Sequence, residues 1–437
     1  MGEWKSGRLS DLVQSLDAGV SVNSEDRPHG AGEIGILKTS ALHGGVFHPE
    51  QNKAVLASER TRVAEPVVAD TILFSRMNTP ALVGESCYVA KNWPSLFVPD
   101  RIWQIKPKDR ETVSMRWLSF ALRSAAARAY IETHASGTSG SMKNLPKFKL
   151  LDLALRYPPA PEQRRIAEVL DALDTTLRQT EVIIEKLKQV KQGLLHDLLT
   201  RGIDANGELR PPQSQAPHLY KDSPLGWIPV PWGDAPLGAI ADLQVGFAFK
   251  SQWFRDSGDV RLLRGDNVGY GAPDWDAAKF LTGSLIQQFN EYLLNAGDVV
   301  VGMDRSFTKT GAKFSVVQQG DLPCLLVQRV GRFIATGCEV PFLRILTLWP
   351  DFHRRLMAQQ KGMDIPHLSK TEILEPIVPV PDPDEQKEIA SRIAAIEARL
   401  TAELRVAQKL KLEKSGLMDD LLTGRVRVTP LLAGAAP

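Results

Sequence analysis

Apolar residues recur every seven positions over two long stretches of the chain. Counted from Ile166 and from Ile389, each stretch carries two such rows, and leucine or isoleucine fills most of their positions. The apolar members are Ile166, Leu173, Leu187, Leu194, Leu170, Leu177, Ile184, Leu198, Ile389, Ile396, Leu410, Leu417, Ile393, Leu400 and Leu421. This is the a/d seam of a coiled coil, and it predicts two helices of roughly 38 residues, each about 57 Å long at about 1.5 Å per residue.

Polar residues interrupt both seams at matching places. Thr180 and Lys191 stand in the first seam where Glu403 and Lys414 stand in the second. Polar residues at seam positions specify register and partner choice at some cost in stability. The shared interruptions therefore favour two helices that pack on each other.

The helices belong to a duplication that spans the chain. The segment that starts with Glu162-Gln163-Arg164-Arg165-Ile166-Ala167 returns 223 residues later, from 162 to 385, as Glu385-Gln386-Lys387-Glu388-Ile389-Ala390. Both copies end on similar sequences, at 193–200 and 416–423. A chain duplicated on this scale predicts a pseudo-twofold shape, which suits a target that comes in two halves.

The second helix carries a start signal that the first lacks. Asp382 is placed to be the N-cap, Pro383 the first helical residue, and Glu385 the third member of a capping box. Prolines at 159 and 161 mark the start of the first helix without a capping carboxylate. The string around Asp382 and Glu385 also resembles a compressed PD-(D/E)xK nuclease core, but its spacing is wrong for a metal site.

Short β-type runs precede each helix. They are bounded by turn residues and correspond loosely between the halves, residues 32–38 with 258–264 and 69–74 with 297–302. Helical patterns follow over 115–133 and 349–360. The fold class predicted is α+β, with two mixed α/β domains joined by two long helices.

The proline-rich stretch between the halves reads as an extended linker that ends in an apolar cluster at 225–229. The predicted organisation is one domain over 1–157, a helix over 158–203, the linker over 204–231, a second domain over 232–380, a helix over 381–426 and a tail over 427–437.

Composition narrows the class without naming a function. With 43% apolar and 24% charged residues the chain is globular. It has neither a signal-peptide pattern nor an apolar run of membrane-spanning length, so a cytoplasmic location without membrane contact is expected. Cys87, Cys324 and Cys338 have no metal or disulfide spacing and are expected to be reduced. The net charge of +2 would not by itself suggest a polyanionic partner.

No catalytic or metal-binding constellation emerges from the residues. The sequence has no phosphate-binding GxxxxGK[ST] loop and no HExxH, and Tyr157-Pro158-Pro159 has its aromatic residue on the wrong side for an adenine methyltransferase loop. What remains is recognition, because polar and basic residues gather in loops beside the β-type runs. The candidates for DNA contact are Lys38, Thr39, Ser40, Arg76, Asn78, Thr79, Ser141, Lys143, Asn144, Arg264, Asp266, Asn267, Arg305, Ser306, Thr308 and Lys309.

The whole chain resembles the specificity (S) subunits of type I restriction-modification systems. The resemblance rests on Pro-Pro-Ala-Pro-Glu-Gln-Arg-Arg-Ile-Ala at 158–167 and its echo at 381–390, and on the Gly-Leu-[Leu/Met]-x-Asp-Leu-Leu-Thr helix ends. It also rests on Gly226-Trp227-Ile228-Pro229 followed by Trp232, and on a strand over 324–330.

This resemblance implies two target-recognition domains, each reading one half of a bipartite sequence in double-stranded DNA. The two helices would form an antiparallel coiled coil that sets the spacing of the half-sites. Two methyltransferase subunits would carry S-adenosylmethionine and methylate adenine, and restriction-translocase subunits would complete the assembly. The chain itself would bind no cofactor or metal and catalyse nothing. A coiled-coil scaffold without a DNA role and a fused restriction-methylase enzyme are the alternatives.

Overall fold

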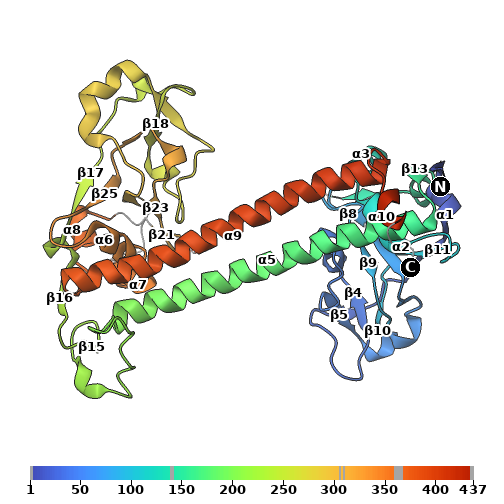
Figure 1. The fold of residues 1–437 in the computed structure, drawn as a ribbon, viewed down its shortest axis with the longest axis horizontal. Coiled ribbons are helices and arrows are strands. Elements are labelled where there is room, and N and C mark those ends of the chain that lie inside the picture. The colour runs from blue at the N-terminus through green and yellow to red at the C-terminus, as the bar shows by residue number, and fades with distance from the viewer. Residues whose placement is uncertain (1–2, 138–141, 305–306, 309–310, 359–367, 434–437) are drawn as a thin grey trace. The chain divides into compact units, whose positions relative to one another are not determined.

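The structure, a computed structural model, describes residues 3–137, 142–304, 307–308, 311–358 and 368–433. The chain divides into two compact units, unit 1 with Met1–Val182 and Arg405–Pro437, and unit 2 with Ile183–Leu404. Both long helices are present, α5 over Ala160–Thr200 and α9 over Pro383–Thr423, each of 41 residues (Figure 1). Each unit therefore holds one α+β domain, the first half of the helix that follows it and the second half of the other helix.

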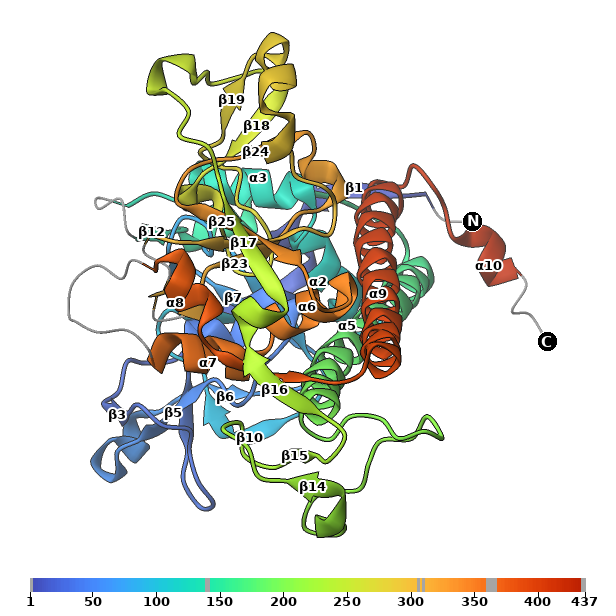
Figure 2. The ribbon, with the colours of Figure 1, turned by 90° about the vertical axis from the view of Figure 1, so that its left-hand side faces the viewer.

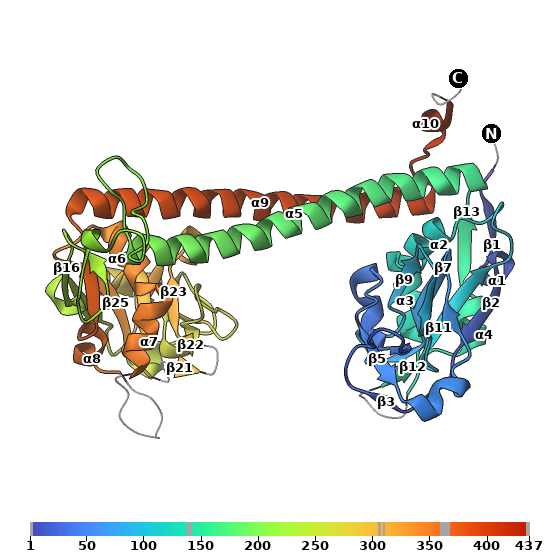
Figure 3. The same ribbon diagram turned by 90° about the horizontal axis from the view of Figure 1, so that it is seen from below.

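Unit 1 is built on a four-stranded and a five-stranded sheet, in the orders β2-β11-β7-β9 and β3-β5-β4-β10-β6, and the pairs β1-β13 and β12-β8 complete it (Figure 3). Its strands are β1 Lys5–Arg8, β2 Val13–Ala18, β3 Ser24–Glu25, β4 Gly35–Leu37, β5 Asn52–Val55, β6 Pro66–Val67, β7 Thr71–Ser75, β8 Met77–Asn78, β9 Ser86–Val89, β10 Trp93–Phe97, β11 Ile102–Pro107, β12 Lys143–Asn144 and β13 Ala154–Tyr157.

Unit 2 has a four-stranded sheet in the order β17-β25-β20-β23 and a three-stranded sheet in the order β19-β18-β24, with the pairs β16-β26, β21-β22 and β14-β15 (Figure 2). Its strands are β14 Tyr220–Lys221, β15 Ile228–Pro229, β16 Gly233–Pro236, β17 Ala241–Val245, β18 Val260–Leu263, β19 Lys279–Leu281, β20 Val299–Gly302, β21 Phe307–Thr308, β22 Gly311–Ala312, β23 Phe314–Val316, β24 Cys324–Leu326, β25 Val330–Ala335 and β26 Ile377–Val380.

The shorter helices also repeat between the units. Unit 1 has α1, α2, α3 and α4 within its domain and α10 after the long helix, and unit 2 has α6, α7 and α8. Their bounds are α1 Leu9–Leu12, α2 Met115–Leu122, α3 Ala125–His134, α4 Lys147–Leu151, α6 Val340–Thr347, α7 Pro350–Ala358, α8 Lys370–Leu374 and α10 Thr429–Ala433.

The duplication reaches the topology of the sheets. The four predicted β-type runs overlap with β4, β18, β7 and β20, and β7 and β20 lie at the same place in their four-stranded sheets. Among the strands that the structure describes, each unit has one parallel pair of neighbours, β4 with β10 and β18 with β24. The fold class expected from the sequence is confirmed.

The structure differs from the local predictions in three places. The helical pattern over 115–133 is two helices, because the Ser124 side chain caps a new helix by accepting from the Ala127 N–H. The second half has α6 before the predicted helix, hidden by the nearly continuous apolar run of Val340–Thr347. The predicted strand over 324–330 is two strands, β24 and β25, with a turn at Arg329.

The two long helices pack antiparallel within each unit. In unit 1, Ile166 and Leu170 of α5 share a hydrophobic core with Leu421 and Leu422 of α9, and that core continues into Trp117 of α2. In unit 2, Leu198 and Leu199 of α5 share a core with Ile389 and Ile393 of α9, and with Phe342 of α6. The start of each helix is thus buried against the end of the other. All fifteen apolar seam residues predicted are buried or half-buried.

The charged interruptions of the seam form matching ion pairs. Lys191 Nζ lies 2.7 Å from Glu397 in unit 2, and Lys414 pairs with Asp174 in unit 1. Positions 174 and 397 are separated by the same 223 residues as 191 and 414, so the two pairs are equivalent. Each pair joins α5 to α9 at a seam position. A leucine there would pack in the seam but would no longer specify how the two helices align.

Arginines of the two domains bind to the same stretches of the helices. Arg344 of α6 donates to Glu397 at 2.8 Å, and Arg116 of α2 donates through Nε to Asp171 of α5 at 2.7 Å. Glu397 thus joins α5, α9 and the domain helix α6. Burial by itself raises the pKa of Glu397, but the hydrogen bond from Lys191 and the positive charges of Arg344 and Lys191 outweigh it and lower that pKa below its ordinary value.

The repeated Glu-Gln pair holds each domain to the start of its helix. Gln163 Oε1 accepts from the Ser114 N–H at 2.9 Å, and Gln386 Oε1 accepts from the Glu339 N–H at 2.8 Å. Ser114 and Glu339 are the N-caps of α2 and α6. Each glutamine therefore satisfies a backbone donor at the start of a domain helix, which would otherwise be left unpaired on burial.

The predicted capping box at 382–385 is only half formed. Asp382 Oδ1 accepts from the Asp384 and Glu385 N–H groups, both at 3.0 Å, so it is the N-cap. The Glu385 carboxylate instead turns toward Arg210 and Trp232, because both of its oxygens are taken there. The apolar cluster that ends the linker contributes Ile228 to the core of unit 2, whereas Trp227 is exposed.

The lowered pKa of Glu397 predicts that the stability of unit 2 depends on pH. Its folded pKa is lower than its unfolded one, so its stabilisation is present above the ordinary value of 4.5 and is lost as pH falls through the folded pKa. We expect Glu397→Gln to lower the stability of unit 2 at pH 7 by about 1–2 kcal/mol, since the pair is partly exposed to solvent. The difference from wild type should shrink steadily below pH 4.5.

Urea unfolding of both proteins between pH 3 and 8 measures this difference. Glu388→Gln is the matched control, because Glu388 lies on the same helix and pairs with Arg392, with a side chain that is 48% exposed against 21% for Glu397. A Glu397→Gln penalty that is the same at pH 3 and pH 7 would contradict the assignment.

Candidate nucleic-acid interface

Two loops that are far apart in the sequence of unit 1 meet in a small ladder. Strand β8 pairs antiparallel with β12, so that Asn78 lies opposite Lys143 and Met77 opposite Asn144. The Leu145 N–H donates to the Arg76 carbonyl at 2.9 Å and extends the ladder. The structure thus brings the candidates of 76–79 together with Lys143 and Asn144.

The side chains of this ladder differ in how accessible they are. Asn78 is 9% exposed, and its amide donates to Ser75 Oγ and accepts from the Thr79 N–H. Arg76 is half-buried; its Nε donates to the Asp100 carbonyl, and its guanidinium lies 5.8 Å from the Trp103 ring centre. Asn78 therefore shapes the loop from inside, while Thr79 is exposed.

Lys38, Thr39 and Ser40 begin a short helix, η1 over Thr39–Gly45, directly after β4. The Lys38 ammonium pairs with Asp26 at 2.9 Å, and Ser40 Oγ donates to Gln51 at 3.0 Å. Leu42 of η1 is buried in a core with Leu73 of β7, which fixes this loop to the strand that leads into 76–79. Both candidate loops of unit 1 are thus attached to β7.

In unit 2 two of the candidates border a cleft of about 710 Å³. Arg264 and Asp266 line it together with Lys313, Gln328 and Arg329. Arg264 Nε donates to Asn267, which is 1% exposed and whose amide donates to the Asp274 carbonyl. Asn267, like Asn78, supports its loop from inside.

Arg329 is a candidate that the sequence analysis missed. It lies in the turn between β24 and β25 with φ of 65°, a left-handed conformation that is uncommon for a residue with a side chain. The side chain is 67% exposed and pairs with Asp304. Such backbone strain clusters at functional sites. Its signal in the sequence was weak, because Cys324–Val330 resembles one apolar strand.

The cleft carries more positive than negative charge. Arg264, Lys313 and Arg329 face two carboxylates, Asp266 and Asp304, along its lining. An excess of cations beside exposed polar groups is what phosphate contact needs.

The remaining candidates lie at the limit of what the structure describes. Thr308 is in the short strand β21. Ser141, Arg305, Ser306 and Lys309 lie outside the described residues, so for them the DNA-contact hypothesis stays a prediction.

Segments that resembled catalytic motifs have structural roles. Asp382 is a helix cap and Glu385 is buried at a domain junction, so the nuclease-like string is part of the frame. Burial raises the pKa of the Cys324 thiol to about 12, which keeps it protonated at neutral pH.

Within the described ranges, no group of three or more His, Cys, Asp or Glu residues is placed to hold a metal. In the same part of the chain, no helix has the length and apolar character needed to cross a membrane.

Comparison with known proteins identifies the class. A family model described as the type I restriction modification DNA specificity domain matches residues 1–189 and 229–413. The match covers most of both halves, so the chain belongs to this family.

Similar proteins carry the name of specificity subunits. The type I restriction enzyme MjaVIII specificity subunit of Methanocaldococcus jannaschii is 28% identical over 305 residues, which span 69% of this chain and 68% of that protein. The EcoAI specificity subunit of Escherichia coli is 32% identical over 168 residues, 38% of this chain and 28% of that protein.

Solved structures support the fold. The S subunit of the type I restriction-modification system from M. genitalium aligns with a TM-score of 0.58 at 16% identity, covering 96% of both chains. A chain from a structure that concerns complex assembly and conformational transition of the type I R-M system aligns with a TM-score of 0.53 at 14% identity, covering 96% of this chain and 97% of that one.

Proposed function

We propose that this chain reads a bipartite DNA sequence, one half-site with the domain of each unit, and thereby directs partner adenine methyltransferase and restriction subunits to it. The observation that carries the proposal is the duplication, which extends from the sequence to the sheet topology and to single hydrogen bonds such as those of Gln163 and Gln386. A duplicated reader fits a target with two half-sites. Membership of the DNA specificity family supports the same conclusion.

The proposed division of labour places chemistry on the partners. Base edges in the major groove would be read by the loops attached to β7 and by the cleft beside β24 and β25, and cationic side chains would contact phosphates. S-adenosylmethionine would be bound by two methyltransferase subunits, which would flip and methylate adenine. The chain would act as a non-catalytic subunit, and titration of labelled S-adenosylmethionine against the purified chain should show no binding.

Genome-wide mapping of N6-methyladenine tests the proposal directly. In cells that carry the methyltransferase partner, we expect a bipartite motif whose methylation disappears when this gene is deleted. Replacing residues 1–157 by the corresponding domain of another family member should change one half-site and leave the other unchanged. If deletion leaves the methylation pattern intact, the scaffold alternative gains support, and a scaffold should show no dependence of DNA retention on salt.

The long helices are proposed to set the gap between the half-sites. Insertion of one heptad into α5 and one into α9 adds about 10 Å at about 1.5 Å per residue, which corresponds to about three base pairs of B-DNA. We expect the methylated motif to gain a longer gap, or methylation to stop because the domains no longer face the DNA. The same motif with an unchanged gap would contradict the ruler role.

An Arg329→Gly variant distinguishes a role of Arg329 in DNA contact from a role in stability. Its left-handed backbone costs a non-glycine residue about 1–2 kcal/mol, and an exposed ion pair contributes little, so Arg329→Gly should keep or raise the urea midpoint of unit 2. Retention of DNA by the complex with the methyltransferase should nevertheless fall about tenfold, with a smaller slope of log affinity against log salt.

Arg354→Ala is the matched control, because Arg354 is an exposed arginine of the same unit that pairs with Asp351 and lies outside the cleft lining. We expect it to leave DNA retention unchanged. Equal DNA retention by wild type and Arg329→Gly would show that Arg329 does not contact the DNA.

A further inference from the structure

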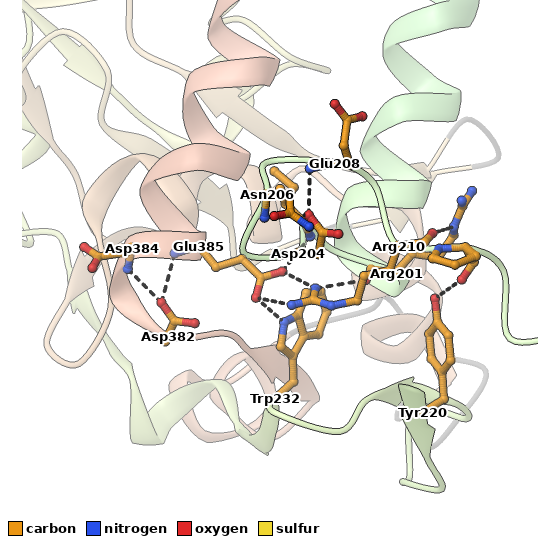
Figure 4. A network of polar contacts seen from close by, with 12 residues as sticks. Arg201, Asp204, Asn206, Glu208, Arg210, Tyr220, Trp232, Asp382, Asp384 and Glu385 are labelled. Atoms are coloured by element: carbon orange, nitrogen blue, oxygen red, sulfur yellow. Dashed lines mark hydrogen bonds and ion pairs between the residues drawn. The ribbon is translucent and has the colours of Figure 1, made fainter. Parts of the chain in front are cut away.

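Each unit buries one glutamate where three parts of the chain meet. In unit 2 this is Glu385, in the first turn of α9, with a side chain that is 6% exposed (Figure 4). It accepts from Arg210 at 2.5 and 3.1 Å, from Trp232 Nε1 at 2.9 Å and from the Ile203 N–H at 2.7 Å. Arg210 and Ile203 follow the end of α5, and Trp232 precedes β16, the first strand of the domain.

Unit 1 has the equivalent junction at Glu162, in the first turn of α5, with a side chain that is 3% exposed. Arg427, four residues beyond the end of α9, donates to it through Nε at 2.7 Å and through a terminal nitrogen at 2.8 Å. The Arg427 guanidinium also lies 5.8 Å from the ring centre of Trp4, which precedes β1 as Trp232 precedes β16. The start of the domain, the start of α5 and the segment after α9 therefore meet around one buried carboxylate.

The helix ends approach the two tryptophans closely. Gly202 and Gly424, which follow α5 and α9, have φ of 63° and 75°. A Cβ on Gly202 would lie 2.3 Å from the Trp232 ring, and one on Gly424 would lie 3.2 Å from the Trp4 ring. The segment after each helix is thus seated on the tryptophan at the start of its unit's domain.

The junctions differ in how many groups support them. Glu385 has a guanidinium, an indole and a backbone N–H as donors. Among the described residues, Glu162 accepts side-chain hydrogen bonds from Arg427 alone, and the indole nitrogen of Trp4 is buried with no hydrogen-bond partner. A buried carboxylate that loses its counter-charge is strongly destabilising. The junction of unit 1 therefore depends on one side chain contributed by the C-terminal segment of the chain.

The tryptophan held at this junction leads directly into the first strand of the recognition domain. Trp4 is followed by β1, which pairs with β13 over four residues, from Lys5 opposite Tyr157 to Arg8 opposite Ala154. Strand β13 in turn leads into α5 and Glu162. A junction that loosens would release this strand pair from the helix start.

We propose that Arg427 is a positioning residue for the N-terminal domain, so that the C-terminal segment of the chain determines how faithfully residues 1–157 read their half-site. This rests on the proposed function, since it concerns the reading of one of its two half-sites. Arg427 acts through Glu162 and Trp4 and does not itself contact the DNA.

Hydrogen exchange of the purified full chain tests the junction without DNA or a partner. In Arg427→Ala we expect the amides of β1 and β13 to exchange at least about tenfold faster than in wild type, while those of β16 and β26 keep the wild-type rate. Arg427→Lys should restore part of the protection, because it keeps the charge but lacks the paired geometry. Arg210→Ala is the mirror control and should loosen β16 and β26 only. Unchanged exchange of β1 and β13 in Arg427→Ala overturns the proposal.

The methylation motif tests the consequence for reading. Domain replacement over 1–157 first assigns one half-site to the N-terminal domain. In cells with Arg427→Ala, mismatches at that half-site should become methylated or full methylation there should fall about tenfold, while the other half-site stays as strict as in wild type. Loss of fidelity at both half-sites alike, or at neither, overturns the positioning role. Absence of any bipartite motif with the wild-type chain contradicts the proposed function instead, and exchange at β1 and β13 then decides the junction separately.

Discussion

A carboxylate that is taken out of water costs several kcal/mol unless charged donors replace its hydration. Glu162 and Glu385 are buried in this way at the first turns of the two long helices, where arginines that follow the opposite helix neutralise them. Each glutamate can be buried only if the end of one helix, the start of the other and the first strand of a domain are all packed around it. The glutamine that follows has an equally fixed place, since its side chain accepts from the backbone N–H of the residue that caps α2 or α6. Two adjacent polar residues thus specify how helix and domain join.

The seam between the two helices likewise needs specific polar contacts in addition to buried apolar area. Leucine and isoleucine at the seam positions bury surface without choosing a unique register. Lys191 and Lys414 add that choice, because each needs an acidic residue at one position of the opposite helix and finds it in Glu397 or Asp174. Because these pairs are partly buried, the cost of removing both charges from water offsets much of their attraction, so their contribution lies more in selecting the alignment than in total stability.

The sequence predicted the frame of the molecule better than its candidate nucleic-acid interface. The heptads and the duplicated sequences predicted two long helices, and the β-type runs predicted β4, β7, β18 and β20, because these elements follow from local periodicity. The position of α6 could not be predicted, because an apolar run of eight residues is compatible with a buried strand. The turn at Arg329 escaped for a related reason, since its left-handed backbone is imposed by tertiary contacts and arginine gives no local signal for it.

The candidate residues show why residue type alone is a poor guide to a nucleic-acid interface. Asn78 and Asn267 have the side chains that read adenine, yet both are buried and hydrogen-bonded within their own loops. Lys313 and Arg329 were not selected from the sequence, yet they line the cleft beside Arg264.

An amide that fixes a loop from inside and an amide that faces a base look the same in a sequence, because the difference is set by the tertiary fold. Under the proposed function, substitutions of the exposed side chains in these loops would change the target, while the buried asparagines and the Glu-Gln junctions would keep the frame intact. If each half of the chain reads its own sequence, as proposed, a frame that is specified twice by the same few polar contacts is what permits it.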